Sequence, residues 1–427
     1  MNKCLIILTR KYPYSYGEPS LETEFPYHQK LFNRIIVLAE DVSKDEKITR
    51  VPPESVEYYN TATSSRRAGR IKDKLKCARF AFKPNDAVKT DKSVIGLKPV
   101  HNVFLWSFEE RCQRLIKEAR AVLDNLDLSG LDEIVLYSYW FFANVRVAVT
   151  LADDLRKKYN VPVRVVSRAH RHDIYEYANA LKYLPLRKYL LSNVEKVYTC
   201  SKDGADYMRQ KYPEYSDKID VSFLGTKDSG LGCSQPGDVF HIVSCCRVVP
   251  VKRLERLADS LALIDKPFVW TVIGGGIEGD GYYNSVKKHI MSKLGNKSNA
   301  KVEFTGALPH DDIFEYYKNN YVDVFVNVSA SEGIPQVIME ACSFGVPIVA
   351  TAVGGTAEIL SDGENGYLLN KDFKDEDCAE AILKIMNAKS EQIELFRANA
   401  REKWQKNFNY AVNNEWFAQE IYKKADK

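Results

Sequence analysis

The feature that most constrains the fold is an alternation of short apolar runs with longer amphipathic stretches, and this alternation occurs twice. The first half contains runs typical of buried strands: "CLIIL", "RIIVLAE", "EIVLYSY", "VRVVSRA", "KVYTCS" and "IDVSFLG". The second half contains more: "HIVSCCR", "FVWTVIG", "KVEFTG", "VDVFVNV", "PIVATAV" and "GYLL". Strands that alternate with helical patterns are typical of parallel sheets covered by helices. The sequence therefore predicts an α/β protein with two Rossmann-like domains that face each other.

The expected domain boundary lies in a segment rich in Gly, Ser and Pro, "GTKDSGLGCSQPGD", at 225–238. A chain of 427 residues suits two domains of about 200 residues each. We expect an N-terminal Rossmann-like domain at 1–228 and a C-terminal one at 229–400. The last segment, 401–427, has a helical and aromatic pattern, and we expect it to pack back across both domains.

Composition excludes several classes of protein. A net charge of only +4 argues against a nucleic-acid partner. The nine cysteines include no CxxC pair, so neither a disulfide framework nor a zinc site is expected. No apolar run approaches the roughly 18 residues that cross a bilayer, and "MNKCLIILTR" is typical of a buried strand rather than a signal peptide. These features favour a cytoplasmic location.

Charge is nevertheless uneven along the chain. The segment 66–92, "RRAGRIKDKLKCARFAFKPNDAVKTDK", holds ten Lys and Arg against three Asp. Such a segment is often a solvated helix and loop. It is also the kind of basic surface that rests on anionic lipid, which would place the protein at the inner face of a membrane. Both interpretations remain open at this point.

A glycine-rich loop follows one of the expected strands. "VIGGGIEG" fits the pattern G-x-G-x-x-G with Gly274, Gly276 and Gly279, which in isolation suggests NAD binding. A dinucleotide fold would place this fingerprint on its first strand and follow it with a tight helix start, whereas a polar stretch, "EGDGYYNS", follows here. A dehydrogenase is therefore the weaker alternative.

Two cations lie between an expected strand and the next helix. Arg247 and Lys252 occur in "SCCRVVPVKRLERLADSL", at the carboxyl end of the strand. Cations beside a helix N-terminus suit a diphosphate, because side chains and helix dipole both favour its negative charge. Taken alone, the same residues could be a solvated basic turn.

Two glutamates, Glu332 and Glu340, lie eight positions apart in "SEGIPQVIMEACSFGVP". If Pro335 lies in the first turn of a helix, Glu332 lies just before the N-terminus of that helix. Eight helical steps span about 12 Å, which exceeds the roughly 5–9.5 Å between the paired carboxylates of glycosidases. The two acids could instead bind two ends of one elongated ligand, with the amides of Gly333 and Ile334 at a phosphate between them. A nucleotide sugar has this layout.

At this point a resemblance to a known family becomes specific. "SASEGIPQVIMEACSFGVPIVATAVGGTAEIL", with "RVVPVK" upstream and "GENGYLL" downstream, resembles the retaining GT-B glycosyltransferases of family 4. Their E-x7-E element matches Glu332 and Glu340. In the first half, "TRKYPYSYGEPSLETEFPYHQ", "LYSYWF", "VSRAHRHDIYE" and "VSFLGT" resemble members that build bacterial polysaccharides. The resemblance covers nearly the whole chain and implies a GT-B fold.

The resemblance implies roles for residues of the second half. Arg247 and Lys252 would hold the diphosphate, and Glu340 the ribose. Glu332, with the amides of Gly333 and Ile334 ahead of Pro335, would hold the donor sugar. The turn "TGALPHDD", at 305–312 and including Leu308, would flank the base. Where the family often has Gly before the diphosphate arginine, this chain has Cys246, a small residue that requires only a modest local shift.

It also implies roles for residues of the first half. Gly17, in the loop after the first strand, would let the backbone approach the diphosphate. His170, in "SRAHRHD", matches the histidine that contacts the donor sugar near the reacting carbon, and His172 is the next candidate. Outside this context, a hydrogen-bonded loop histidine would be the simpler interpretation of either.

These observations predict a retaining glycosyltransferase that moves a sugar from a UDP- or GDP-sugar to a hydroxyl acceptor, in a cleft between the domains. The acceptor would be a glycan or lipid-linked glycan of surface polysaccharide assembly. Arg247 and Lys252 would stabilise the leaving group, with Glu332 and His170 beside the reacting sugar. No cofactor and no metal are expected. The acidic triplet at 375–377 opens a predicted helix, where acids are favoured without any metal.

Two alternatives stay open. A non-catalytic nucleotide-sugar-binding or scaffold protein can have the same fold, although loss of Glu332, Arg247 or Lys252 would have favoured it and all three are present. A sugar-nucleotide epimerase or a phosphorylase on this fold is the other. Incubation of the donor alone, or with phosphate, separates these two activities from transfer.

Overall fold

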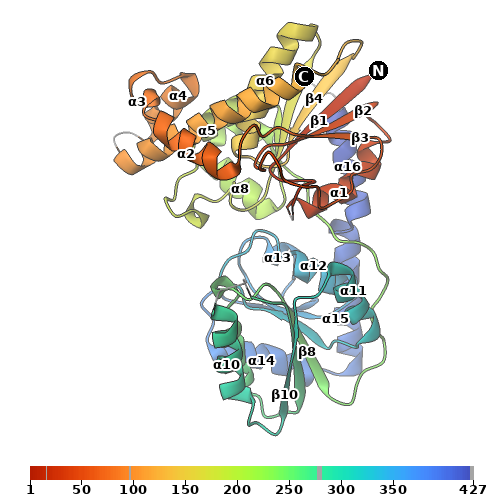
Figure 1. The fold of residues 1–427 in the computed structure, drawn as a ribbon. Helices are drawn as coiled ribbons and strands as arrows, with labels where there is room; N and C mark the ends of the chain where they lie inside the picture. Colours follow the sequence, from red (N-terminus) through yellow and green to blue (C-terminus); the bar gives the residue numbers. More distant parts are fainter. Residues whose placement is uncertain (16, 96–97, 277–280, 424–427) are drawn as a thin grey trace. The chain divides into compact units, whose positions relative to one another are not determined.

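The computed structural model describes residues 1–15, 17–95, 98–276 and 281–423. The chain forms two compact units. Unit 1 comprises 1–222 and 414–427, and unit 2 comprises 223–413. The boundary thus falls a few residues before the predicted 228/229 junction, and 401–413 belongs to unit 2. Each unit is described by itself below, and Figure 1 labels their elements.

Unit 1 is built on a parallel sheet of seven strands in the order β3-β2-β1-β4-β5-β6-β7. The strands are β1 (Lys3–Thr9), β2 (Arg34–Ala39), β3 (Val56–Asn60), β4 (Glu133–Ser138), β5 (Val163–Ala169), β6 (Lys196–Thr199) and β7 (Ile219–Val221). All seven residues of β1 are buried, as its apolar run requires of a central strand covered on both faces.

Helices cover both faces of this sheet. They are α1 (Pro19–His28), α2 (Arg66–Lys76), α3 (Arg79–Phe82), α4 (Asp86–Ile95), α5 (Pro99–Leu123), α6 (Ala143–Tyr159), α7 (Arg187–Asn193) and α8 (Lys202–Lys211), with 3-10 turns η1 (Glu176–Ala178) and η2 (Pro213–Lys218). Successive side chains of a strand point to opposite faces. Accordingly, Ile6 and Leu8 pack with α5 and α6, whereas Leu5 and Ile7 pack with α1 and the end of the chain.

Unit 2 repeats the plan with a parallel sheet of six strands in the order β10-β9-β8-β11-β12-β13. The strands are β8 (Phe240–Cys245), β9 (Phe268–Ile273), β10 (Ala300–Gly306), β11 (Val324–Asn327), β12 (Ile348–Thr351) and β13 (Gly366–Leu369). The helices are α9 (Leu254–Leu261), α10 (Tyr282–Leu294), α11 (His310–Asn319), α12 (Gln336–Ser343), α13 (Thr356–Ile359), α14 (Asp375–Met386) and α15 (Ser390–Asn407), with the 3-10 turn η3 (Pro250–Lys252). The predicted α/β class with two Rossmann-like parallel sheets is confirmed.

The C-terminal segment is two helices rather than one. After α15, the helix α16 (Tyr410–Tyr422) begins anew, and its residues from 414 onward belong to unit 1. The break has a local cause, because the Asn409 side chain accepts the Ala411 N–H, while Thr226 exchanges backbone hydrogen bonds with Phe408 and Tyr410. Gly225 permits this approach, since a Cβ there would lie 2.5 Å from the Tyr410 nitrogen.

One strand was not predicted. β3, "VEYYN", lies at the edge of the first sheet, and after Val56 its residues are partly buried or, at Tyr58, exposed. The strand mixes polar and apolar residues and therefore lacks the apolar run that marks the central strands. Across the part of the chain that the structure describes, no helix combines the length and the apolar content that a membrane span needs.

Candidate functional site

The carboxyl edge of the second sheet is shaped by backbone contacts between two loops. Cys246 follows β8 and donates its N–H to the carbonyl of Ile273, and Val248 donates to Gly275. Gly274 adopts φ +139°, and a Cβ there would lie 1.8 Å from the Cys246 carbonyl oxygen. Only glycine fits this approach. The glycines after β9 thus hold the β8 loop in place.

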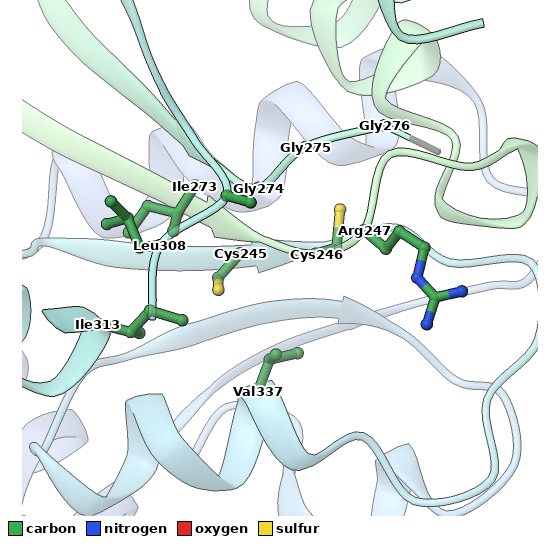
Figure 2. A pocket seen from close by; sticks show the side chains of 11 residues that line it. Cys245, Cys246, Arg247, Ile273, Gly274, Gly275, Gly276, Leu308, Ile313 and Val337 are labelled. Atoms are coloured by element: carbon green, nitrogen blue, oxygen red, sulfur yellow. The ribbon is translucent and has the colours of Figure 1, made fainter. Parts of the chain in front are cut away.

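These loops border a cavity of roughly 480 Å³, within the range of small-molecule sites. Figure 2 shows Leu308 and Ile313 on one side, Val337 from the start of α12 opposite, and Arg247 at the far end. Cys245, Cys246, Ile273, Gly274, Gly275, Gly276 and Ala307 complete the lining. The cavity brings together two predicted site residues, Arg247 and Leu308. The third glycine of the fingerprint, Gly279, lies outside the described residues.

Arg247 is a cation at this edge whose charge is not paired within the described residues. Its side chain is exposed and, within the described parts of the chain, forms neither a hydrogen bond nor an ion pair with another residue. Figure 2 shows the guanidinium extending beyond the glycine loop. A free guanidinium at the rim of a cavity can donate two parallel N–H bonds to the oxygens of a phosphate group.

Lys252 and Glu332 form an ion pair at the same edge. The Lys252 ammonium lies 2.5 Å from Glu332 Oε1, and both side chains are largely buried. Asn327, at the end of β11, donates a longer contact of 3.5 Å to the same oxygen. Burial raises the pKa of the Cys246 thiol to about 12. The charge of Lys252 lowers this pKa and the charge of Glu332 raises it, so the pair lies close to this lining residue.

Glu340 is buried on α12 and pairs with a residue that sequence reasoning missed. His310, the first residue of α11, places Nε2 2.9 Å from Glu340 Oε1. This hydrogen bond raises the pKa of His310 above its ordinary value. Burial, and then the charge of Glu340, raise the pKa of the cavity-lining Cys245. Glu340 therefore contributes negative charge beside the cavity.

The loop before α12 presents backbone rather than side chains. Gly333, Ile334 and Pro335 are buried. Gly333 accepts the N–H of Gly355, and Gly354 adopts φ +52°, where a Cβ would lie 2.3 Å from the Glu332 carbonyl oxygen. Pro335 is the N-cap rather than a residue of the first turn, because the helix begins at Gln336. Its carbonyl accepts the N–H groups of Ile338 and Met339.

In unit 1, His170 directly follows β5 and is held in one orientation. Its Nε2–H donates to the Tyr139 carbonyl at 3.1 Å, and its backbone N–H donates to Asp173. The ring stacks on Tyr139 and packs against Trp140. Burial lowers the pKa of His170, so the neutral imidazole is favoured and Nδ1 is left as its acceptor. His172 is exposed, and its pKa is also lowered.

Gly17 lies in the loop after β1, next to a glutamate that the sequence did not single out. A Cβ at Gly17 would meet Lys11 at 3.4 Å, an ordinary contact, so packing within unit 1 does not require glycine there. Glu18, in contrast, is buried with φ 51° and accepts the N–H groups of Arg10 and Tyr12 and of the Trp140 indole. Glu18 is therefore the residue that fixes this loop.

The acidic triplet at 375–377 opens α14, as predicted. Asp377 accepts the Lys374 N–H at 2.8 Å and so satisfies a backbone donor at the start of the helix. Within the described residues, no group of three or more His, Cys, Asp or Glu side chains is arranged to hold a metal ion. The acids of this triplet thus have a structural use at a helix N-terminus.

Comparison with known families finds a match in the second unit. The family model Glycosyl transferases group 1 matches residues 234–407. The match lies within unit 2, and the matched residues are called the group 1 domain below. The cavity, Arg247, the Lys252–Glu332 pair and the Glu340–His310 pair all lie within this group 1 domain.

Individual relatives agree with this domain. An uncharacterised glycosyltransferase of Methanocaldococcus jannaschii is 26% identical over 263 residues, which cover 61% of this chain and 67% of that protein. A lipopolysaccharide core biosynthesis glycosyltransferase of Rhizobium meliloti is 30% identical over 135 residues, or 32% of this chain and 36% of that protein. The match thus spans two thirds of the first relative and about a third of the second.

Solved structures extend the likeness beyond the group 1 domain to nearly the whole chain. HepE from Anabaena, solved in complex with UDP and glucose, has a TM-score of 0.63 at 16% identity, covering 98% of this chain and 99% of that chain. Sucrose-phosphate synthase from Thermosynechococcus elongatus has a TM-score of 0.67 at 16% identity, with 98% of each chain covered. At such identity the likeness concerns the fold alone, and the fold is GT-B.

Proposed function

We propose that this chain is a retaining glycosyltransferase of family 4 that transfers a sugar from a UDP- or GDP-sugar to a hydroxyl acceptor. The observation that carries the proposal is the site in the group 1 domain. A cavity of roughly 480 Å³ has the free Arg247 at its rim. The ion pair of Lys252 and Glu332 lies beside its lining residue Cys246.

The diphosphate would lie against Arg247 and Lys252. In the reaction, the bond between the anomeric carbon and the diphosphate oxygen breaks, and a bond to the acceptor oxygen forms on the same face of the sugar. The acceptor proton passes to the departing diphosphate, whose growing charge the two cations stabilise. This route needs neither a covalent nucleophile nor a metal ion, and we propose that the enzyme works without either.

The acids would bind hydroxyl groups at the two ends of the donor. Glu340, beside the cavity, would accept the ribose hydroxyls in place of His310. Glu332 would bind the donor sugar through its second carboxylate oxygen, because Lys252 occupies Oε1. The amides of Gly333 and Ile334 would bind phosphate at the start of the helix that follows. Leu308 would contact the base.

Residues of unit 1 would serve the sugar and the acceptor. His170 is neutral, and its orientation is fixed by Tyr139 and Asp173, so Nδ1 can accept a hydrogen bond from a sugar hydroxyl. Gly17 would leave room for the donor diphosphate. The relative that assembles lipopolysaccharide core supports a glycan or lipid-linked glycan as the acceptor.

We also propose that unit 1 meets an anionic membrane surface through α2 and α3. Ile71, Leu75 and Phe82 are 51%, 77% and 86% exposed, and their spacing of four and seven residues places them on one helical stripe. The residues between the two helices, Cys77 and Ala78, keep helical dihedrals, so the stripe continues across them.

The face of α2 that contacts the protein is polar, which supports the same proposal. Gly69 and Asp73 are buried, and Asp73 is bound by Arg114 of α5 at 3.0 Å. The apolar stripe therefore points away from unit 1, and exposed cations flank it, among them Lys72, Lys74 and Lys76. An exposed apolar stripe with flanking cations is typical of helices that lie in a membrane interface.

A direct test combines binding with product analysis. A thermal-shift series with UDP, GDP and their sugars should raise the unfolding temperature for one nucleotide class, since a ligand that binds only the folded state stabilises it. With that donor and a set of acceptors, NMR should show transfer with the anomeric configuration kept. Epimer formation from the donor alone, phosphate-dependent cleavage, or binding without turnover would point to the alternative functions instead.

A further inference from the structure

A cluster of arginines surrounds one aspartate at the carboxyl edge of the first sheet. Asp41, which follows β2, is 4% exposed at its side chain. It lies 3.0 Å from an Arg10 nitrogen, 3.3 Å from one of Arg111 and 3.5 Å from one of Arg66. A fourth cation, Arg70, is one helical turn from Arg66 on α2. These four arginines and Asp41 are called the Asp41 cluster below.

The positive charge of the cluster exceeds what Asp41 can neutralise. Partial loss of solvent contact lowers the pKa of the exposed Arg70, and the charge of Arg66 lowers it further, as expected where cations crowd one another. Although burial favours the neutral acid, Arg111 and Arg10 hold the pKa of Asp41 below its ordinary value, so Asp41 is ionised. One full negative charge thus faces four guanidinium groups.

Three neighbouring acids do not supply the missing charge, and a fourth, Glu18, is bound to backbone and indole N–H groups. Glu40 is fully enclosed, and burial raises its pKa well above the ordinary value, which favours the neutral acid. It is hydrogen-bonded to the Asn144 amide at 2.5 Å. Asp73 and Glu118 are committed to Arg114, at 3.0 Å and 2.8 Å.

The guanidinium groups also retain unused donors. The Nε atoms of Arg66 and Arg111 are buried and lack a hydrogen-bond partner among the residues that the structure describes. Buried polar groups are nearly always satisfied in native proteins. Arginine forks match phosphate oxygens, which accept two parallel N–H bonds. The unused donors and the excess charge therefore point to the same kind of ligand.

The position of the cluster in the fold supports a ligand site. Arg10 follows β1 and Asp41 follows β2, and ligands of parallel α/β sheets bind at the carboxyl ends of the strands. Arg66 is the first residue of the eleven-residue helix α2, whose dipole adds positive potential at that end. Glu18 fixes the loop that carries Arg10 by accepting its N–H at 2.9 Å.

We propose that the Asp41 cluster binds a phosphate or diphosphate group, and that this group belongs to the acceptor of the transfer reaction. The second clause rests on the proposed function. The first concerns residues of unit 1, whereas Arg247 and Lys252, which would hold the donor diphosphate, belong to unit 2. The phosphate can come from a soluble sugar phosphate or from the headgroup of a lipid-linked acceptor.

The test measures pyrophosphate binding by calorimetry in the presence of saturating UDP, or of GDP if the thermal-shift series selects it, to occupy the donor site. The full chain should retain one pyrophosphate site under these conditions. Arg66→Gln with Arg70→Gln should weaken it at least tenfold, while Arg120→Gln should leave it unchanged. Arg120 is the matched control because it lies on α5, as Arg111 does, but forms a separate ion pair with Asp154.

Equal affinity in the cluster variant and the wild type, or no UDP-insensitive site at all, overturns the proposal. Circular dichroism checks that the variants fold, and Arg70→Gln alone, at an exposed position, serves if the double variant does not. Arg247→Gln with Lys252→Gln separates this proposal from the proposed function. That variant should lose UDP binding and keep the pyrophosphate site of unit 1.

Phosphatidylglycerol vesicles distinguish the two sources of phosphate. If the ligand is a lipid headgroup, the cluster variant should lose both vesicle and pyrophosphate binding. Ile71→Ser with Leu75→Ser and Phe82→Ser should then lose vesicle binding and keep pyrophosphate binding. If the ligand is a soluble phosphate, the cluster variant should lose pyrophosphate binding alone.

Discussion

The carboxyl edges of the two sheets offer a direct comparison, because the same architecture carries two kinds of charged surface. In unit 2, Lys252 is matched by Glu332 and His310 by Glu340, and Arg247 has no partner within the described residues. In unit 1, three arginines converge on Asp41, and Arg70 lies one helical turn from one of them. Balanced charges suit a ligand that brings both hydroxyls and phosphates. Excess positive charge suits a ligand that is mainly anionic.

The two edges also differ in what sets their shape. In unit 2, Gly274 and Gly354 bring backbone to within distances that any side chain would block, so the site is defined by main-chain geometry. In unit 1, long arginine side chains reach a common point from separate elements. A backbone-defined site discriminates ligands by shape, whereas a cluster of flexible cations selects mainly by charge.

The largest expected effect concerns the cations of unit 2. Arg247→Ala and Lys252→Ala should each lower kcat by about a hundredfold, because both act on charge that grows as the donor bond breaks. The measurement is turnover of the donor found by thermal shift, with Lys371→Ala as an exposed control. Wild-type turnover in either folded variant would remove the basis for the donor site.

The next effect separates the two acids of unit 2. Glu340→Ala should weaken binding of free UDP or GDP by roughly 30-fold, as expected for lost hydrogen bonds to a carboxylate. Glu332→Ala should leave that affinity nearly intact and damage transfer, because its ligand is the sugar. Calorimetric titration of both variants with the nucleoside diphosphate decides between them, and equal losses would refute separate roles.

A third prediction concerns the basic stripe of unit 1. Lys72→Gln with Lys74→Gln should weaken binding to phosphatidylglycerol vesicles by roughly 30-fold, since each cation near an anionic surface contributes about 1 kcal/mol. Sedimentation with vesicles at increasing salt measures this effect, which should fall with ionic strength. Lys287→Gln with Lys288→Gln, the same charge change on α10 of unit 2, should have no effect. Equal losses in both variants would show that only net charge matters.

A smaller effect depends on pH. The hydrogen bond to Glu340 raises the pKa of His310, so the pair's stabilising contribution is complete below the ordinary histidine pKa of about 6.5. It is lost as the pH rises through the raised value. If ribose replaces His310 on Glu340, nucleotide affinity should rise a few-fold over that range. His310→Ala should remove this dependence, and an identical pH profile in the variant would contradict the exchange.

The smallest expected effect concerns metals. Excess EDTA should leave most of the activity, because Arg247, Lys252 and the amides before α12 supply the positive charge that the diphosphate needs. Asp375→Asn with Asp377→Asn should be nearly silent in turnover, with at most a small loss of stability from the α14 cap. Loss of activity in EDTA that magnesium or manganese restores would assign the leaving-group chemistry to a metal ion.

Much of the fold could be predicted because the buried strands of a parallel sheet have continuous apolar sequences. β3 was not predicted because an edge strand such as "VEYYN" need not be apolar along its whole length. The break before α16 had a signal in Asn409, a good N-cap residue, but the matching approach of Gly225 comes from 185 positions away and cannot be read locally.

Residues of the candidate site that match a motif one by one could be predicted from the sequence. The pairs that these residues form with other side chains could not. Arg247, Lys252, Glu332 and Glu340 are recognisable by motif. That Lys252 binds Glu332 follows only from the adjacency of β8 and β11 in the sheet, which no spacing reveals. His310 and Glu18 were missed because their partners, a carboxylate on α12 and the N–H groups of a loop, are set by tertiary structure.

Because residues from 414 onward belong to unit 1, unit 2 is in effect an insertion within the chain of unit 1. Phe417 and Ile421 are fully buried in the unit 1 core, and the Lys3 ammonium donates to the Tyr422 carbonyl. During synthesis, unit 2 can therefore complete its core before unit 1 does, although unit 1 begins first. The buried core of unit 1 is therefore complete only once α16 has been made, after the whole of unit 2.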